Sequence, residues 1–235
     1  MKEKEQGALS RCGLFRGMTE GERDALLDCL AARRRDFARG EALWLTGDRV
    51  DACAVVLAGQ VRAETVSAAG ERSVTALHGP GALVGDVLMA TPDMASPVDV
   101  FAAADSAVLF LPFSRIMSGC GRCCEAHTRL RENLLSEIAG KFWTLRRKIG
   151  YLSCRSLRGR IAARLLDERA RRGGDTFSLG GTREDLADLL GVNRSALSRE
   201  LSRMRSDGLI DFWRDSFRLL DPEGLGRWAS TGNGG

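Results

Sequence analysis

The chain has 235 residues, of which 44% are hydrophobic and 28% are charged, and its formal net charge at pH 7 is +4. These values are typical of a soluble globular protein of one or two domains. The chain begins with polar and charged residues, and charged residues interrupt every apolar stretch before it reaches the roughly 18–20 residues of a membrane span. We therefore expect a cytoplasmic protein with no secretory signal and no membrane partner.

The cysteines and the basic residues narrow the class further. Seven cysteines is an odd number, which favours thiols or metal ligands over a disulfide framework in a chain without an export signal. After residue 152 the chain contains fifteen arginines, twelve acidic residues and no lysine. Arginine offers a planar, bidentate group to guanine or phosphate. A GC-rich genome produces the same bias, so both explanations stay open.

The first predicted elements are a short helix and a β-rich region. Thr19 and Glu22 have the spacing of a capping box, and the residues after them follow a helical period. The inner face of this helix carries Leu26, Leu27, Leu30 and Ala31. From Phe37 to about Leu111, short apolar runs alternate with glycines, which indicates an antiparallel β-sandwich or β-barrel.

A long amphipathic helix is predicted between about His127 and Leu152. Its apolar residues recur at spacings of three, four and their multiples, at Leu130, Leu134, Ile138, Leu145, Ile149 and Leu152. A helix of roughly 25 residues with a narrow apolar seam is typical of a coiled-coil-like dimer contact. The alternative is a helix that packs only on its own barrel.

The C-terminal region has the spacing of a winged helix-turn-helix. A helix around Ile161 and Leu165 is expected to end at Gly173-Gly174, and two further helices are predicted over 183–190 and 194–206. In the segment between these two, Thr182 caps the first helix, Gly191 permits a tight turn and Val192 fills the corner. Alternating residues over 208–220 predict a β-hairpin wing.

The outward face of the second of these helices suits the major groove of DNA, because it carries small polar side chains and two guanidinium groups. Arg199 is the prime candidate for a contact to guanine O6 and N7, whereas Arg183 and Arg203 are placed like phosphate clamps. The candidate DNA-binding residues are Thr182, Arg183, Asn193, Arg194, Ser195, Ser198, Arg199 and Arg203. A helical hairpin with a solvated outer face is the alternative.

Several motifs resemble those of the cyclic AMP receptor and fumarate-nitrate regulator (CRP/FNR) superfamily. They are Phe37-x-x-Gly40-Glu41-x-Leu43-x-x-x-Gly47-Asp48, Val56-Leu57-x-Gly59-x-Val61-Arg62, Gly79-Pro80-Gly81-x-x-x-Gly85-Asp86, and the stretch from Asp185 to Ile210, with Arg-Ser-Ala-Leu-Ser-Arg-Glu-Leu-Ser-Arg-Met at 194–204. The resemblance implies an α+β fold: a cyclic-nucleotide-binding-like jelly-roll barrel with a short helix (1–125), a dimerisation helix (126–152) and a winged helix-turn-helix (153–230). The glycine-rich tail (231–235) is expected to be disordered.

In that family the barrel binds an effector, the long helix forms a homodimer, and the winged domain binds a two-fold symmetric DNA operator, with RNA polymerase as a further partner. Cyclic-nucleotide-binding members hold the phosphate with a Glu after Gly and a downstream Arg-Ser/Thr pair. Here the Glu is replaced by Asp86 and the pair by Ser96-Pro97, so the strongest charge-assisted bond to a phosphate is missing. We therefore expect the branch that does not bind cyclic AMP. The effector-pocket candidates are Gly85, Asp86, Val87, Ser96 and Pro97.

Cofactor-based sensing has weaker support. Iron-sulfur members use closely spaced N-terminal cysteines, and only Cys12 precedes Cys29 here, so neither a cluster nor a heme at His78 is expected. A thiol and imidazole group that suits zinc or redox chemistry lies ahead of the long helix, at Cys120, Cys123, Cys124 and His127. Because a single C-x-x-C also occurs among ordinary core cysteines, we predict no metal, and structural and sensing roles both stay open.

Catalysis is not expected. A metal-dependent barrel needs two or three histidines with a carboxylate, whereas this barrel has only His78, and no nucleophile elbow, P-loop or dinucleotide motif occurs. The sequence therefore predicts a dimeric DNA-binding transcription regulator, controlled by an unidentified effector or redox signal at the barrel. A Cys-His thiol or metal sensor, and a barrel that binds no ligand and serves dimerisation only, are the alternatives.

Overall fold

The computed structural model describes residues 3–66, 70–118 and 124–230, so the predicted tail at 231–235 lies outside the described residues. The chain forms two compact units, 1–140 and 141–235. Within the described ranges, no helix combines the length and the apolar character needed to span a membrane.

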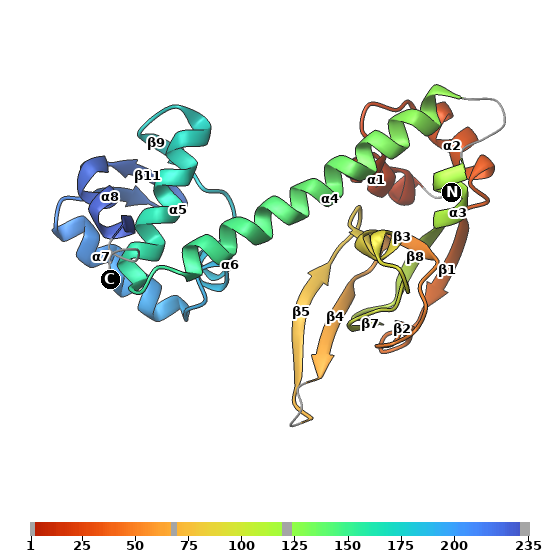
Figure 1. Cartoon of the computed structure of the whole chain (residues 1–235), viewed down its shortest axis with the longest axis horizontal. Helices are drawn as coiled ribbons and strands as arrows, with labels where there is room; N and C mark the ends of the chain where they lie inside the picture. Colours follow the sequence, from red (N-terminus) through yellow and green to blue (C-terminus); the bar gives the residue numbers. More distant parts are fainter. Residues whose placement is uncertain (1–2, 67–69, 119–123, 231–235) are drawn as a thin grey trace. The chain divides into compact units, whose positions relative to one another are not determined.

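The elements of the first unit are shown in Figure 1. Its helices are α1 (Glu3–Arg11), the 3-10 helix η1 (Gly13–Phe15), α2 (Glu20–Cys29), the 3-10 helix η2 (Asp86–Ala90) and α3 (Phe113–Ser118), and α4 (Glu125–Leu152) begins in it. Its strands are β1 (Arg33–Phe37), β2 (Ala42–Trp44), β3 (Ala52–Ala58), β4 (Val61–Val66), β5 (Arg72–His78), β6 (Leu83–Val84), β7 (Asp99–Ala102) and β8 (Ser106–Pro112).

The strands form two antiparallel four-stranded sheets, ordered β1-β8-β3-β6 and β2-β7-β4-β5. Residues of both sheets share one core, which includes Phe37, Trp44, Val56, Val100 and Val108. The predicted antiparallel β domain of the jelly-roll type is therefore confirmed as two sheets packed over one core.

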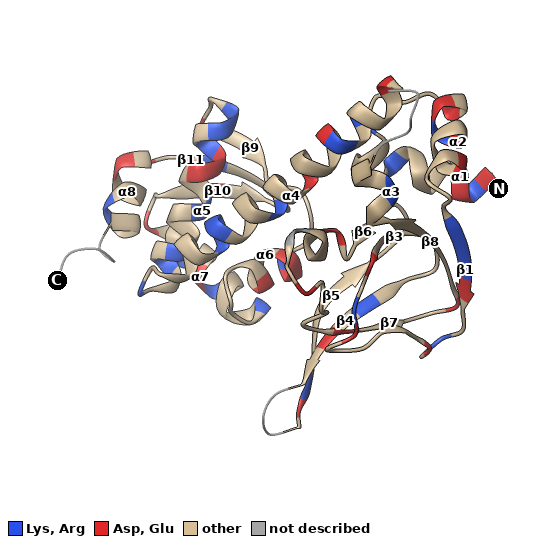
Figure 2. Cartoon of the chain, turned by 45° about the vertical axis from the view of Figure 1, so that its right-hand side comes forward, with Lys and Arg blue, Asp and Glu red and all other residues tan. Residues whose placement is uncertain are grey.

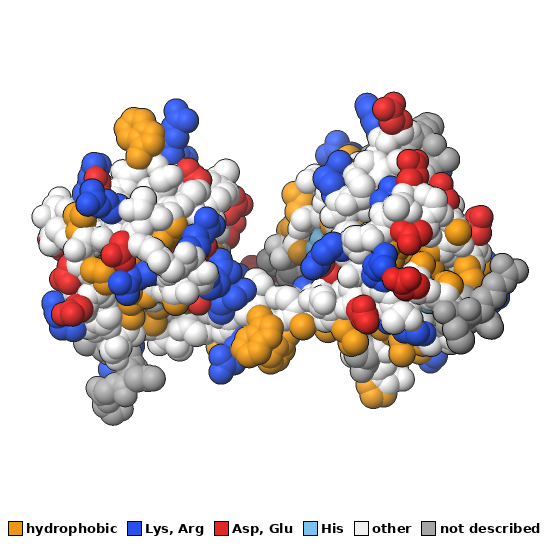
Figure 3. All heavy atoms as spheres, turned by 90° about the horizontal axis from the view of Figure 1, so that it is seen from above, with side chains coloured by type: hydrophobic (Ala, Val, Ile, Leu, Met, Phe, Trp, Pro, Cys, Tyr) orange, Lys and Arg blue, Asp and Glu red, His pale blue; other side chains and the backbone are white. Residues whose placement is uncertain are grey.

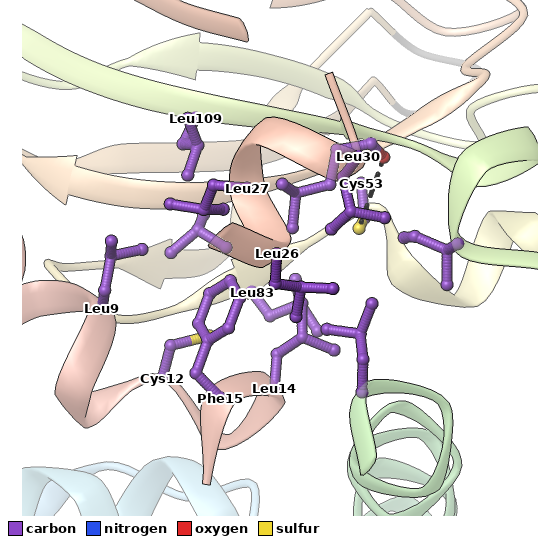
Figure 4. Close-up of a cluster of buried hydrophobic side chains, with 14 of the residues drawn as sticks. Leu9, Cys12, Leu14, Phe15, Leu26, Leu27, Leu30, Cys53, Leu83 and Leu109 are labelled. Carbon is purple, nitrogen blue, oxygen red and sulfur yellow. Dashed lines mark hydrogen bonds between the residues drawn. The ribbon is translucent and has the colours of Figure 1, made fainter. Parts of the chain in front are cut away.

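The run Ala54-Val55-Val56-Leu57 is apolar throughout because both faces of β3 are covered. Successive side chains of a strand point to opposite faces. Ala54 and Val56 pack in the core between the sheets, whereas Val55 and Leu57 pack in a second core with the helices. Figure 4 shows this second core, where side chains of α1, η1 and α2 meet Cys53 and Leu109 of the sheet.

The two N-terminal helices differ in how clearly the sequence predicts them. The capping box at α2 is confirmed: the Glu22 amide donates to Thr19 Oγ1 (3.3 Å), and the Thr19 amide donates to Glu22 Oε2 (2.7 Å). Helix α1 was not predicted, because its buried face is short. Ala8 and Leu9 are fully buried, and the buried Glu5 pairs with Arg34 at 3.0 Å.

The long helix α4 has 28 residues and takes part in both units, whose boundary at 140/141 lies within it. Leu130 and Leu134 lie in the helix-covered core of the first unit. Tyr151, near the other end, lies in the core of the second unit. The helix is therefore held by a separate core at each end.

The second unit contains the predicted winged helix-turn-helix. Its helices are α5 (Leu157–Arg172), α6 (Arg183–Leu189), α7 (Arg194–Ser206) and α8 (Pro222–Ser230), and its strands are β9 (Thr176–Ser178), β10 (Ile210–Trp213) and β11 (Ser216–Leu219). The wing is confirmed, since β10 and β11 pair antiparallel, and β9 adds a third strand to β11. Gly173, at φ +74°, ends α5 as expected. Strand β9 and helix α8 were not predicted.

Candidate nucleic-acid interface

The helix-turn-helix is set by three local devices. Thr182 and Asp185 form a capping box at α6, with the Asp185 amide donating to Thr182 Oγ1 at 3.1 Å. Gly191 has φ +65° in the turn, a left-handed value that any other residue adopts at a cost. Asn193 caps α7, because its Oδ1 accepts from the Ala196 amide at 2.8 Å. Thr182 and Asn193, both candidates for DNA contact, therefore also define where the two helices begin.

The inner faces of the two helices are buried and the outer face of α7 is exposed. The buried residues are Leu186, Ala187 and Leu190 on the α6 side and Leu197, Leu201 and Met204 on α7. The outer face of α7 carries the exposed residues Arg194, Ser195, Ser198, Arg199, Ser202 and Arg203, and Arg205 and Ser206 are also exposed near the end of the helix. Figure 2 shows that basic residues recur along α5 and α7. The side chains chosen from the sequence as an outward face thus share one exposed face.

Two arginines of this face have no acidic partner. Among the residues that the structure describes, neither Arg194 nor Arg199 forms an ion pair, whereas Arg203 lies 3.4 Å from Glu200 Oε2. A guanidinium without a carboxylate partner keeps its donors for a ligand. Arg194 and Arg199 are therefore the groups of this face best prepared to contact an anionic or base-edge acceptor.

Helix α5 holds α7 in place. The Arg158 Nε donates to Glu200 Oε1 at 2.6 Å, and its Nη1 lies 2.7 Å from Asp207 Oδ2. The same guanidinium lies 4.9 Å from the Trp228 ring centroid. The neighbouring Arg160 donates to the Leu190 carbonyl at the end of α6, at 3.0 Å. Sequence reasoning did not single out these two arginines as the positioning residues of the helix-turn-helix.

Arg183 is placed differently from the exposed arginines. Its guanidinium carbon lies 4.9 Å and 5.0 Å from the ring centroids of Phe212 and Phe217, on the wing strands. Burial lowers the pKa of Arg183, while the negative charge of Asp215 acts in the opposite direction. Arg183 therefore ties α6 to the wing by cation-π contacts.

A buried carboxylate on α5 stabilises this unit. The side chain of Glu168 is 2% exposed and accepts hydrogen bonds from Arg164 (2.7 Å), Arg171 (2.5 Å) and Arg172 (2.6 Å). Burial by itself raises the pKa of Glu168. The three arginines, Arg172 foremost, outweigh burial and bring the pKa down to about 2.

This lowered pKa predicts a loss of stability in acid. Because the folded-state pKa of Glu168 lies below its unfolded value of 4.5, its contribution is complete above about pH 5 and is lost as the pH falls towards 2. We expect the free energy of unfolding to fall by about 1–2 kcal/mol through this group between about pH 6 and pH 3. Urea unfolding of the unsubstituted chain and of Glu168→Gln at both pH values measures this difference in the free energy of unfolding. A variant with the same pH dependence as the natural chain would contradict the prediction.

The predicted effector-pocket residues lie on two segments that both approach residues 44–48: Gly85 lies beside Trp44, and the backbone of Ser96 bonds to the backbone of residues 47 and 48 at 2.8 and 2.9 Å. Gly85, at φ +77°, precedes η2, and a Cβ on it would lie 3.3 Å from the Trp44 ring. Ser96 is buried, and its hydroxyl donates to the Val98 carbonyl at 2.6 Å. Asp86 is fully buried, whereas Val87 and Pro97 are exposed. The Ser96 hydroxyl therefore donates to the backbone of its own segment.

The predicted thiol and imidazole cluster is described in part. Cys120 and Cys123 lie outside the described residues. Cys124 and His127 are in contact, with 3.0 Å between Sγ and Nδ1. Within the described part of the chain, no group of three or more His, Cys, Asp or Glu side chains is placed to hold a metal ion.

The apolar residues of α4 divide into two sets. Leu130 and Leu134 are buried in the core of their own chain, so they are not available to a second copy. Leu145 and Ile149 are about 60% exposed, Leu152 is 37% exposed, and Ile138 is partly buried. Leu135 and Phe142, which sequence reasoning missed, are also exposed. Figure 3 shows exposed hydrophobic side chains on the middle of α4.

The signal for the missed residues is a strict heptad spacing. Leu135, Phe142 and Ile149 are seven residues apart, and so are Ile138, Leu145 and Leu152, which gives alternating steps of three and four. Residues at such a and d positions form one seam of a helix. The seam defined by these six residues is called the α4 seam below.

Comparison with known proteins identifies both domains. Residues 34–122 match the cyclic nucleotide-binding domain family, and residues 159–228 match the Crp-like helix-turn-helix domain family. The chain is 28% identical over 204 residues to the transcriptional activator protein FnrA of Stutzerimonas stutzeri, covering 85% of this chain and 81% of the relative. It is 26% identical over 213 residues to the anaerobic regulatory protein of Haemophilus influenzae, covering 88% and 80%.

Solved structures share the fold. The catabolite activator protein of Thermus thermophilus superimposes with a TM-score of 0.53 at 24% identity, covering 93% of this chain and 99% of that chain. The c-di-GMP responsive global regulator CLP of Xanthomonas campestris superimposes with a TM-score of 0.50 at 18% identity, covering 84% and 99%. The resemblance inferred from the sequence motifs is confirmed: the chain belongs to the CRP/FNR superfamily of transcription regulators, with a cyclic nucleotide-binding-type domain followed by a Crp-like helix-turn-helix DNA-binding domain.

Proposed function

We propose that the chain acts as a homodimer that binds a two-fold symmetric DNA operator, with α7 of each copy in the major groove. The observation that carries this proposal is the exposed face of α7, where Arg194 and Arg199 have no acidic partner among the described residues. Arg199 is the proposed reader of guanine, and Ser195 and Ser198 contact neighbouring base edges or phosphates. Arg183, Arg203, Thr182 and Asn193 contact the DNA backbone and fix the register.

The α4 seam is the proposed dimer contact. Four of its side chains, Leu135, Phe142, Leu145 and Ile149, are 58–67% exposed in the single chain. Large apolar side chains in a regular heptad on a 28-residue helix are covered when a second copy supplies the facing helix. Dimerisation places two recognition helices at half-sites about one DNA turn, roughly 34 Å, apart.

The β domain is the proposed input, for an effector other than cyclic AMP or for a redox signal. Gly85, Asp86, Val87, Ser96 and Pro97 are the proposed lining of the effector site. The winged domains have two arrangements, of which only one matches both half-sites. The input shifts the population between these arrangements, and an effector can do so only if it binds one of them more tightly than the other. RNA polymerase is the further partner that we propose.

The proposed base reader has a direct test. We expect Arg199→Ala to weaken binding to the selected operator by about 1–3 kcal/mol, or about 5- to 150-fold, and to leave binding to random DNA nearly unchanged, because a base contact adds to specific binding only. Operators come from selection out of a random DNA pool, with and without reductant, and fluorescence anisotropy measures affinity.

Arg203→Ala is the matched control. As a proposed phosphate contact, it is expected to weaken binding to both DNAs equally and to reduce the salt slope by about one. An equal loss on operator and random DNA for Arg199→Ala would show that Arg199 does not read bases. No sequence preference in the selection from the natural chain would contradict operator binding itself.

A further inference from the structure

A nucleophile and a base meet at the first turn of α4. Cys124 Sγ lies 3.0 Å from Nδ1 of His127, and the His127 amide donates to the Cys124 carbonyl at 3.1 Å. The backbone contact fixes the two residues on one turn, so the side-chain contact is held by the fold of the helix. Cys124 is partly buried, whereas Cys12, Cys53 and Cys154 are buried.

The surroundings of the imidazole favour its neutral form. His127 is 2% exposed. Burial lowers the pKa of His127, and the positive charge of Arg131 lowers it further. Both effects favour the uncharged imidazole over the imidazolium, and an uncharged Nδ1 has a lone pair that can accept a hydrogen bond from the Cys124 thiol.

The alternative is that the contact between Cys124 and His127 serves only to cap the start of α4. In that case Cys124 would behave as a partly buried thiol, shielded from reagents by the fold. Two features favour chemistry over capping. The contact joins a thiol to a basic nitrogen, the arrangement by which proteins activate cysteine, and the positive end of a 28-residue helix stabilises a thiolate at its first turn.

We propose that Cys124 is a reactive thiol with His127 as its base, and that it is a modification site for small alkylating electrophiles and peroxides. With an alkylating electrophile, the S–C bond forms, the leaving group departs with its electron pair, and the thiol proton passes to Nδ1. With a peroxide, the S–O bond forms and the O–O bond breaks. The thiol is then oxidised to a sulfenic acid, and the peroxide is reduced, with release of water or an alcohol.

The first test compares the folded and unfolded full-length chain. In a background with Cys120→Ser and Cys123→Ser, alkylation by iodoacetamide at pH 7 is followed by peptide mass spectrometry, which reports Cys124 and Cys29 separately. We expect Cys124 to react at least about threefold faster in the folded chain than in guanidinium, because only the folded chain supplies the base. Slower reaction in the folded chain would overturn the proposal.

The second test removes the base. His127→Asn keeps a polar group near the sulfur that cannot take up a proton, and His127→Ala removes it. In the folded variants we expect Cys124 to react about tenfold more slowly, with the rate at Cys29 unchanged. An unchanged Cys124 rate in a folded variant would contradict the role of His127. If circular dichroism shows that neither variant folds, the first test, in which His127 is kept, decides whether Cys124 is a reactive thiol. Neither test uses DNA, so both are independent of the proposed function.

Discussion

Ile149→Glu is expected to turn the proposed dimer into a monomer. Ile149 is 60% exposed at the centre of the second half of the α4 seam, and two-fold symmetry brings its two copies close together. The substitution would place two carboxylates in an apolar contact, where burial of unpaired charge and like-charge repulsion both oppose association. We expect the dissociation constant of the dimer to rise at least about 100-fold, or by about 3 kcal/mol. Sedimentation velocity over a range of concentrations measures it.

Thr144→Glu is the matched control for charge. Thr144 is exposed on the same helix and lies outside the heptad positions of the α4 seam, so the same added charge is expected to leave the dimer intact. Operator affinity is expected to fall with dimer content in Ile149→Glu and to stay unchanged in Thr144→Glu. Equal behaviour of the two variants in sedimentation would show that the α4 seam is not the dimer contact.

Leu201→Ala is expected to have the largest effect on stability. Leu201 is 1% exposed and lies on the inner face of α7, in the core of the second unit. Replacing a fully buried leucine by alanine removes apolar contacts and leaves a cavity, at a cost of about 2–5 kcal/mol. We expect the second unit to unfold at a lower temperature or urea concentration, and the first unit, which has its own cores, to unfold as before.

The neighbouring Ser202→Ala is the control, since Ser202 is exposed and its replacement is expected to change stability by less than about 0.5 kcal/mol. Calorimetry and circular dichroism measure the unfolding transitions. Loss of operator binding in Leu201→Ala follows unfolding, whereas Arg199→Ala is expected to lose binding with its unfolding transition unchanged. Equal unfolding transitions of Leu201→Ala and Ser202→Ala would show that the inner face of α7 does not stabilise the core of the second unit.

The helix-turn-helix was predictable because its determinants are local. The Thr182 cap, the Gly191 turn and the Asn193 cap each act within a few residues, and the structure realises them as capping hydrogen bonds and a positive φ. The outward face of α7 followed from the helical period alone. The β domain was predictable in class because runs such as 54–57 and turn glycines recur along it.

Elements whose formation depends on distant partners were not predicted. Helix α1 is stable because Leu9 enters the core shared by helices and sheet. Strand β9 is three residues long and exists as a strand because it pairs with β11. Such short segments carry too little periodicity to be recognised before their partners are placed.

The sequence by itself determined the family, the two kinds of domain and the residues of the α7 face, because caps, turns and periodicity act over short distances. The tertiary structure decided which apolar residues of α4 face inward, because Leu130 and Leu134 share a period with the α4 seam and only packing separates them. It also decided that Arg183 stacks on the wing and that His127 is shielded from water beside Cys124. Burial and contact between distant segments are properties of the folded chain, and no local pattern encodes them.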